Sequence, residues 1–325
     1  MPAIKKILWG WRQPQRLRDS NPRRSTRKNF NDPCHRGHSR PERRRLMSHL
    51  ISCQDLNKSL DTVEDLVVID CRFDLTAPAL GLTQYLADHI PGAYYLHLND
   101  DLSGPIIANQ TGRHPLPSQK VLSRKLGQMG IQRGTQVVAY DQNQGAFAAR
   151  LWWLLRWLGH DTVQVLNGGY DDWRAHEHPI THDLPAPQPA PFVSQPPLTR
   201  IMQQPDWNKP TNQLIDVRDP ARFRGDHEPI DPIAGHIPGA MNLPFLDNLE
   251  SGRFKDAAIL AKQFAKAGLA DAQTLVCYCG SGVTATQMIL ALLEAGYPEP
   301  ALYPGSWSEW ILDPAHLAAL SDATR

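Results

Sequence analysis

The sequence predicts an α/β protein made of two similar domains, each a parallel sheet with helices on both faces. Three observations lead to this expectation. Short blocks of sequence recur in the same order in the two halves, apolar runs alternate with helical patterns, and a proline-rich segment separates the halves. The chain has 325 residues, which is long enough for two domains of about 150 residues, each with its own core.

Four blocks of sequence recur between the halves. The repeat His-Ile-Pro-Gly-Ala occupies residues 89–93 and again residues 236–240. Four matching blocks in one order indicate a tandem duplication. The other three pairs are residues 67–72 with 214–218, 136–141 with 274–279, and 168–173 with 305–310.

The segment between the halves is rich in proline. Residues 185–197 hold six prolines in 13 positions, which favours an extended and rather stiff connector. We therefore expect an N-terminal domain at residues 48–184, a linker at residues 185–200 and a C-terminal domain at residues 201–325.

Each half alternates strand and helix patterns. In the first half, residues 137–140 read as a buried strand and 151–158 as a helix. The second half has strands at 214–217 and 274–278, a helical spacing over 259–269 and a helix over 283–295. Parallel sheets of this kind bind ligands at the carboxyl ends of their strands. The turns after Tyr140 and Tyr278 are therefore the candidate sites.

The first 47 residues differ in composition from the rest. They carry 14 Lys and Arg against 3 Asp and Glu, with little apolar sequence to bury, so we expect them to be disordered. The favoured interpretation is a non-functional extension ahead of a true start at Met47. An organelle transit peptide and a basic arm for nucleic acid or membrane are the alternatives.

Residues 48–325 carry 20 basic and 30 acidic side chains, which argues against a nucleic-acid partner. No apolar stretch approaches the roughly 20 residues that a membrane span needs. Five scattered cysteines favour a reducing compartment over a disulfide framework. These features favour a cytoplasmic protein that acts on small molecules, with a mitochondrial location as the alternative.

The two candidate turns differ in chemistry. The first turn begins with Asp141, whereas the second reads Cys279-Gly-Ser-Gly-Val-Thr-Ala285 and places a thiol at the strand end. The glycines allow backbone N–H groups to turn toward one point, and the following helix adds the positive end of its dipole. Such surroundings favour the thiolate form, so Cys279 is the predicted nucleophile. Cys277 alternates with Cys279 along the strand and is expected to face the core, with a resolving or metal-binding role as the less favoured alternative.

Together these motifs resemble those of the two-domain rhodanese-type sulfurtransferases. The resemblance covers residues 49–315, and it includes the repeated His-Ile-Pro-Gly-Ala blocks, the Gly-x-x-x-x-Trp blocks and the cysteine loop. The Gly-Ser-Gly form of the loop is similar to the 3-mercaptopyruvate sulfurtransferase branch. The thiosulfate branch has a basic residue after the cysteine, and this chain has Gly280 there.

The resemblance implies a reaction and a set of residues. Cys279 would take a sulfur atom from 3-mercaptopyruvate or thiosulfate as a persulfide and pass it to cyanide or to a thiol, including a thioredoxin-like acceptor. Arg222 would bind the donor anion, and no metal or organic cofactor is implied. The persulfide would be held by backbone amides of Gly280, Ser281, Gly282, Val283 and Thr284.

Two features of the sequence leave the site incomplete. The family has a second substrate arginine after an acid-proline pair, but here Ile230 and Asp231 follow Glu228-Pro229. We also expect His89 to face the cleft and to polarise the donor together with Ser281, although its duplicate His236 indicates that both histidines brace a turn.

Three alternative functions are compatible with parts of the sequence. A thiosulfate-specific enzyme would share the fold and the nucleophile, and so would a persulfide carrier with little turnover. A phosphatase would need an arginine at the sixth position after the cysteine, where this chain has Ala285.

Overall fold

The computed structural model describes residues 48–142, 144–203, 209, 211–269 and 274–317. The expectations for the basic segment 1–47 lie outside these residues.

The first half contains a five-stranded sheet in the order β1-β5-β4-β2-β3, and every neighbouring pair is parallel. Its strands begin where the predicted apolar runs lie, because Val, Ile and Leu are buried on both faces of a covered parallel sheet. The elements in chain order are β1 (Leu50–Ile51), α1 (Cys53–Thr62), β2 (Leu66–Asp70), α2 (Leu80–Ala87), β3 (Tyr94–Tyr95), α3 (Gln119–Gln128), β4 (Gln136–Tyr140), α4 (Ala146–Trp157), β5 (Val163–Leu166) and α5 (Gly169–Ala175).

The second half repeats this topology with a five-stranded parallel sheet in the order β6-β12-β11-β7-β8. It adds a short antiparallel pair, β9 with β10. The elements are β6 (Arg200–Ile201), β7 (Asn212–Asp216), α6 (Pro220–Arg224), β8 (Met241–Asn242), the 3-10 helix η2 (Phe245–Asn248), β9 (Leu249–Glu250), β10 (Arg253–Phe254), α7 (Ala257–Lys266), β11 (Thr274–Tyr278), α8 (Thr284–Glu294), β12 (Ala301–Leu302) and α9 (Ser306–Trp310).

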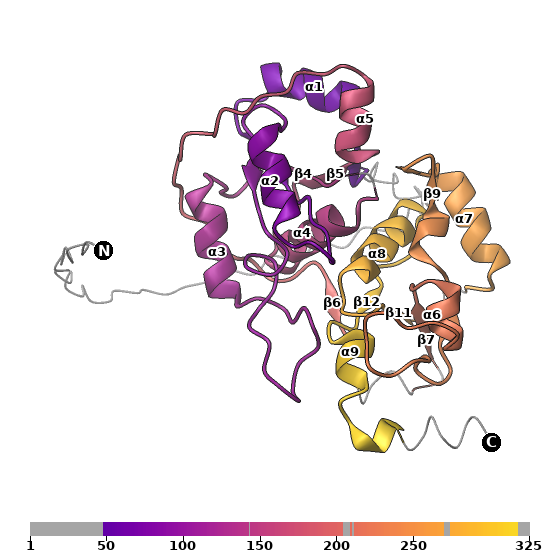
Figure 1. Cartoon of the computed structure of the whole chain (residues 1–325). Helices are drawn as coiled ribbons and strands as arrows, with labels where there is room; N and C mark the ends of the chain where they lie inside the picture. The colour runs from indigo at the N-terminus through magenta and orange to yellow at the C-terminus, as the bar shows by residue number, and fades with distance from the viewer. Residues whose placement is uncertain (1–47, 143, 204–208, 210, 270–273, 318–325) are drawn as a thin grey trace, which may run out of the picture. The chain divides into compact units, whose positions relative to one another are not determined.

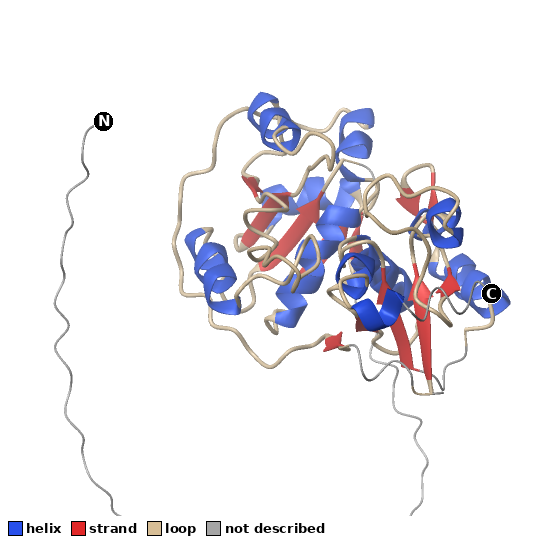
Figure 2. Cartoon of the chain, turned by 60° about the horizontal axis from the view of Figure 1, so that its bottom comes forward, coloured by secondary structure: helices blue, strands red, loops and turns tan. Residues whose placement is uncertain are grey.

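The predicted fold class is confirmed. Position by position, the two strand orders match, so β2 corresponds to β7 and β4 corresponds to β11. Helices lie on both sides of the strands in each half (Figure 2).

Helices α4 and α8 connect the two halves. Each follows the central strand of its sheet, and the two helices contact each other (Figure 1). Their buried side chains, including Trp152, Trp153, Met288 and Ile289, belong to one hydrophobic cluster. Two smaller clusters lie on the opposite faces of the sheets, with Trp173 in one and Trp310 in the other. The paired tryptophans of the repeat are therefore packed in the cores.

The proline-rich segment runs as extended chain along the first half. The Ala190 N–H donates to the Gly127 carbonyl at 2.8 Å, and the Gln195 N–H donates to the Leu158 carbonyl at 2.8 Å. Because proline has no N–H, few of these backbone groups join a ladder. The segment leads directly into β6 of the second sheet.

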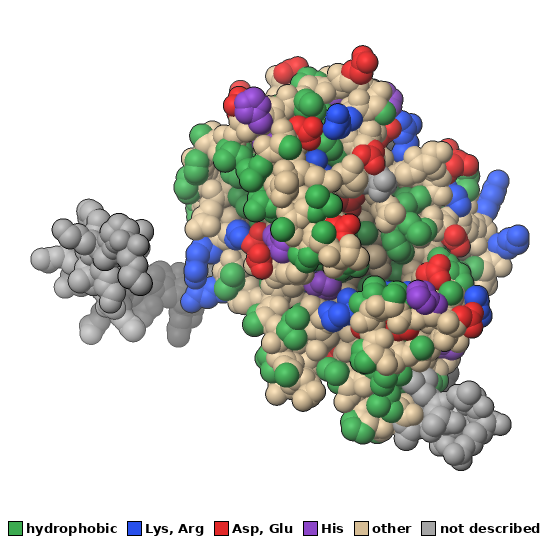
Figure 3. All heavy atoms as spheres, viewed as in Figure 1, with side chains coloured by type: hydrophobic (Ala, Val, Ile, Leu, Met, Phe, Trp, Pro, Cys, Tyr) green, Lys and Arg blue, Asp and Glu red, His purple; other side chains and the backbone are tan. Residues whose placement is uncertain are grey.

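On the face of the molecule seen in Figure 3, basic and acidic side chains are interspersed. No helix within the described residues is long and apolar enough to cross a membrane.

Candidate active site

The loop between β11 and α8 is held by hydrogen bonds to its carbonyl groups. The N–H groups of Trp307 and Ser308, on α9, donate to the carbonyls of Cys279 and Gly280 at 3.0 and 2.9 Å. The carbonyl of Gly282 accepts from Arg150 Nη1 at 3.1 Å. The Cys279 N–H is also bound outside the loop, since it donates to Ser306 Oγ at 3.1 Å. The Gly282 N–H donates to the Cys279 sulfur at 3.1 Å.

Two glycines of the loop lie in tight surroundings. Gly282 has a φ of +77°, and a Cβ atom there would lie 2.2 Å from the Pro304 carbonyl oxygen. A Cβ atom at Gly280 would lie 2.7 Å from Arg113 Nη2 and 3.4 Å from Arg222 Nη2. Side chains at either position would displace the backbone or the guanidinium groups beside the sulfur.

Cys279 lines a pocket of about 240 Å³ and is 2% exposed. Residues of both halves form this pocket, so the site is complete only where the two domains meet. The charged and polar lining residues are Arg113, His114, Gln144, Arg218, Asp219, Arg222, Ser281 and Thr284, and the larger apolar ones are Leu75, Phe147, Ile230, Phe245 and Val283.

Arg222 lies in this pocket, beside the loop as expected. It extends from α6, a short helix capped by the Asp219 carboxylate, which accepts from the Ala221 N–H. Its guanidinium binds Glu228 through Nε and through Nη2, at 2.7 Å for Nη2, and also reaches Asp231 at 3.2 Å. Burial acts to raise the pKa of Glu228, but hydrogen bonds from Arg222 and from two backbone amides outweigh it and lower that pKa.

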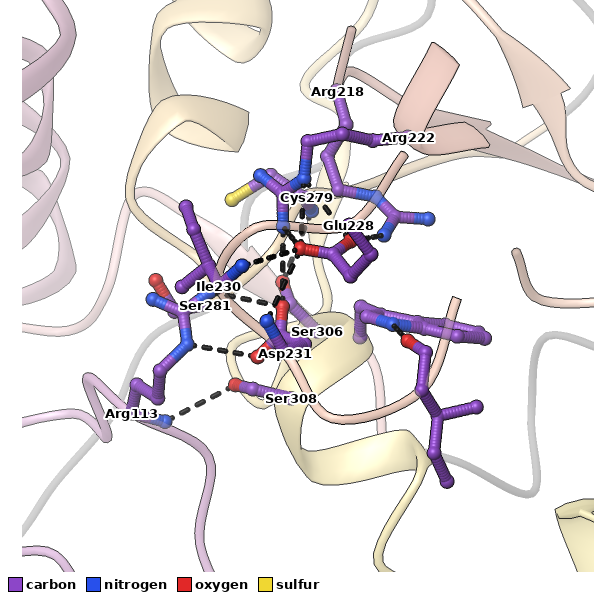
Figure 4. Close-up of polar contacts among 12 residues, drawn as sticks. Arg113, Arg218, Arg222, Glu228, Ile230, Asp231, Cys279, Ser281, Ser306 and Ser308 are labelled. Carbon is purple, nitrogen blue, oxygen red and sulfur yellow. Dashed lines mark hydrogen bonds and ion pairs between the residues drawn. The ribbon is translucent and has the colours of Figure 1, made fainter. Parts of the chain in front are cut away.

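Arg113 is a second arginine in the pocket, which the sequence did not indicate. It comes from the loop between β3 and α3 of the first half, and its Nε and Nη2 bind the Asp231 carboxylate at 2.9 and 3.1 Å. Arg113 and Arg222 thus converge on one carboxylate beside Cys279 (Figure 4). No local signal marks Arg113, because its partners lie more than 100 positions away in the sequence.

His114 is the histidine that contacts the loop. Its Nδ1 lies 2.7 Å from Ser281 Oγ, and its Nε2 lies 3.1 Å from the side-chain oxygen of Asn99. Because an amide oxygen only accepts, Nε2 is assigned the proton, and Nδ1 then accepts from the Ser281 hydroxyl. Burial, with Arg113 and Arg150 nearby, lowers the pKa of His114 to about 3, so the ring is neutral at pH 7.

His89 does not face the cleft, contrary to the expectation. Its Nδ1 lies 2.7 Å from the carbonyl of Tyr85, its Nε2 lies 3.1 Å from the carbonyl of Asp183, and its ring stacks on Tyr85. The duplicate His236 is bound in the same manner, to the carbonyl of Phe223. Both histidines therefore brace the turn before Pro-Gly, the alternative that the repeat indicated.

Two ion pairs recur in the halves, as the duplication predicts. Arg72 binds Asp70 and Arg218 binds Asp216, each at 2.7 Å. The Arg218 guanidinium also lies over the Trp307 ring and donates to the Gly235 carbonyl at 2.6 Å. Arg218 lines the pocket, but buried partners occupy its guanidinium.

Arg150 and Cys277 lie behind the loop. Arg150 is fully buried and donates only to carbonyl groups, among them those of Leu102, His114 and Gly282. Burial lowers its pKa to about 10, so it keeps its charge at pH 7. Cys277 is fully buried in the core, as expected, and belongs to the same hydrophobic cluster as Cys279, because residues two positions apart in a strand share a face. Burial raises the pKa of its thiol. Among the described residues, no three His, Cys, Asp or Glu side chains gather as a metal site.

Comparisons with known proteins point to one family. The sequence profile of the Rhodanese-like domain matches residues 52–176 and 198–313. The chain is 45% identical over 282 residues to a "Probable 3-mercaptopyruvate sulfurtransferase" of Pseudomonas aeruginosa, covering 85% of this chain and 99% of that protein. It is 36% identical over 239 residues to a thiosulfate sulfurtransferase of Cricetulus griseus, covering 70% of this chain and 78% of that one. The structure of 3-mercaptopyruvate sulfurtransferase from Leishmania major matches with a TM-score of 0.74 at 28% identity, covering 85% of this chain and 78% of that chain.

Proposed function

Because this chain belongs to the rhodanese family and is a sulfurtransferase, we propose that it moves sulfur from 3-mercaptopyruvate to a thiol acceptor through a persulfide on Cys279. In this proposal the C-terminal domain, residues 201–325, carries the nucleophile, and the N-terminal domain, residues 48–184, completes the pocket. The observation that carries it is the position of the Cys279 sulfur, which accepts the Gly282 N–H in a pocket that also holds Arg222.

The first half-reaction loads the enzyme. The Cys279 thiolate attacks the sulfur of the donor, an S–S bond forms, and the donor's S–C bond breaks. The electron pair of that bond passes to carbon and gives the enolate of pyruvate, which takes up a proton and leaves. We expect the amides of Gly280 through Thr284 to stabilise the charge on the bound sulfur, and the Gly282 N–H already donates to the Cys279 sulfur.

Ser281 is one pocket residue that can accept a hydrogen bond from the donor. Since its hydroxyl donates to the neutral His114, its remaining lone pairs are available to accept a hydrogen bond from the donor thiol. Asn99 fixes the tautomer of His114 through Nε2. His114 therefore orients Ser281 in the role that we expected of His89.

The second half-reaction returns the enzyme to its starting state. An acceptor thiolate, or cyanide, attacks the outer sulfur of the persulfide, the S–S bond breaks, and the Cys279 thiolate leaves. Thiols of thioredoxin-like proteins are acceptors of the required chemistry. Two half-reactions on one cysteine predict ping-pong kinetics.

The charge balance of the pocket favours 3-mercaptopyruvate over thiosulfate. The guanidinium groups of Arg113 and Arg222 are matched by the carboxylates of Glu228 and Asp231. A donor with one carboxylate adds a single negative charge to this balanced cluster, whereas thiosulfate adds two. Gly280 also leaves no basic side chain after the cysteine to hold the second charge.

The four described cysteines are free thiols. This supports a reducing compartment, and we propose the cytoplasm, with a mitochondrial location as the alternative.

The proposal is tested with purified protein by two measurements. Treatment with 3-mercaptopyruvate should add about 32 Da, one sulfur atom, to Cys279, as detected by mass spectrometry of the intact protein and its peptides. With cyanide as acceptor, thiocyanate should form faster from 3-mercaptopyruvate than from thiosulfate.

Two variants serve as controls. Cys279→Ser should lose both the mass increase and the turnover, whereas Cys277→Ala should keep both. Equal turnover for Cys279→Ser and the parent would refute the proposal. A stable persulfide without turnover would identify a carrier, and faster turnover with thiosulfate would identify the thiosulfate-specific alternative.

A further inference from the structure

Arg113 is fixed beside Cys279 by contacts of its backbone with the second domain. Its N–H donates to Ser308 Oγ at 3.1 Å. The preceding Gly112 lies so close to α9 that a Cβ atom there would be 2.6 Å from the Gly305 carbonyl oxygen. The loop of the first domain is therefore pressed against the helix that holds the cysteine loop, and the Arg113 side chain enters the pocket from there.

The guanidinium of Arg113 lies against the residue next to the nucleophile. Its Nη2 would be 2.7 Å from a Cβ atom on Gly280. Its Nε and Nη2 are bound to Asp231, while its Nη1 has no hydrogen-bond partner among the described residues. Arg222 shows the same pattern, with Nε and Nη2 bound to carboxylates. Each arginine can therefore offer one N–H edge to an anion in the pocket.

The other candidate cations are excluded by their surroundings. Arg218 is buried by Asp216, Glu228 and the Trp307 ring. The position after Glu228-Pro229, where the resemblance led us to expect a second arginine, holds Ile230. Ile230 lines the pocket with an apolar side chain that is 44% exposed.

We infer that Arg113 is the second anion-binding residue for the sulfur donor. It comes from the other domain and takes the role of the arginine that the family has where this chain has Ile230. This inference rests on the proposed function. The donor carboxylate lies between the guanidinium groups of Arg113 and Arg222, and Asp231 is the counterion that both arginines share before the donor binds. Donor recognition then depends on contact between the two domains.

The test separates the two half-reactions. Arg113→Met should lower kcat/KM for 3-mercaptopyruvate by about 10- to 100-fold, the range expected for losing a hydrogen bond to a charged group. It should leave kcat/KM for the thiol acceptor unchanged, because the acceptor attacks a persulfide that is already formed. The persulfide on Cys279 should still form at saturating donor.

Two further variants make the result specific to donor binding. Ile230→Arg, added to Arg113→Met, should restore most of kcat/KM for the donor because it returns a guanidinium to the pocket. Arg253→Met is the matched control, since Arg253 also pairs with a carboxylate of the other half, Asp172, but lies outside the pocket. It should leave kcat/KM for the donor unchanged.

Several results would overturn the inference. If Arg113→Met lowers kcat/KM for the donor and for the acceptor equally, Arg113 only braces the domains. The same conclusion follows if Arg253→Met lowers kcat/KM for the donor as much as Arg113→Met does. Failure of Ile230→Arg to rescue would also count against it. If the parent enzyme forms no persulfide, the proposed function is wrong. This result is obtained without any variant, so it is distinct from a failure of the inference about Arg113.

Discussion

The loops at residues 141–145 and 279–283 occupy the same place in the two copies of the fold and are held by the same backbone bonds. Tyr170 N–H donates to the Asp141 carbonyl at 2.8 Å, and Trp307 N–H donates to the Cys279 carbonyl at 3.0 Å. In both copies the carbonyl of the next loop residue is also bound. The Asp171 N–H donates to the Gln142 carbonyl at 2.9 Å, and the Ser308 N–H donates to the Gly280 carbonyl at 2.9 Å. The duplication has therefore preserved the backbone hydrogen bonds of the first two residues of each turn.

The two loops differ in what their amides hold. The Asp141 carboxylate accepts N–H groups from Gly145, Phe147 and Ala148 at 2.9, 2.9 and 3.2 Å, so this loop binds its own anion. Cys279 places one sulfur atom at the corresponding point and faces a pocket. Backbone amides at a helix N-terminus therefore suit an anion in either copy. A carboxylate makes it a structural element, and a thiol makes it a candidate reaction site.

The largest effect is expected from replacing Cys279 with aspartate, the residue at the corresponding position of the first loop. Cys279→Asp should lower sulfur transfer at least about 1,000-fold, because the nucleophile is replaced by a carboxylate that binds the amides itself. Its free energy of unfolding, measured with urea, should equal or exceed that of Cys279→Ala. Measurable persulfide-dependent turnover in Cys279→Asp, or a stability below that of Cys279→Ala, would break the analogy between the loops.

Removing the carboxylate of the first loop should affect stability more than turnover. Asp141→Ala leaves several buried N–H groups without an acceptor, and we expect the free energy of unfolding to fall by about 2–3 kcal/mol. The folded variant should keep most of its turnover, since Asp141 does not line the pocket. Urea titration gives the first quantity and initial rates give the second. A loss of turnover as large as that of Cys279→Ala would show that the two loops are not functionally distinct.

A change that is smaller for each pH unit is expected in acid. The pKa of His114 in the folded protein is about 3, against an ordinary value near 6.5, so the unfolded chain binds a proton first as the pH falls. Folding stability should therefore decline between pH 6.5 and 3, with about 1.4 kcal/mol per pH unit due to His114. His114→Gln should reduce this slope by about 1.4 kcal/mol per pH unit, the contribution of one proton. Urea titrations at several pH values measure the slope. An unchanged slope would contradict the buried, neutral state of His114 beside the cysteine loop.

Much of the fold and part of the site could be predicted because their signals are local. Val and Ile runs marked β2 and β4, the helix after each turn followed from its periodicity, and the repeat fixed the correspondence of the halves. Cys279 and Arg222 could be named as candidates, and placed in the pocket, because each lies in a short motif of neighbouring residues. The expectation for His89 failed because the same motif in both copies binds main-chain carbonyls, and a motif alone does not show which way a ring faces.

The sequence by itself determined the duplicated α/β fold, the cysteine loop and its difference from the duplicate, since periodicity, glycines and repeats act over a few residues. Only the tertiary structure decided that Arg113 and His114 complete the pocket. Arg113 meets Asp231 across 118 positions and His114 meets Ser281 across 167, and such pairs form only when α4 and α8 bring the two domains together. Contacts between distant segments depend on how the cores pack, and packing leaves no local pattern in the chain.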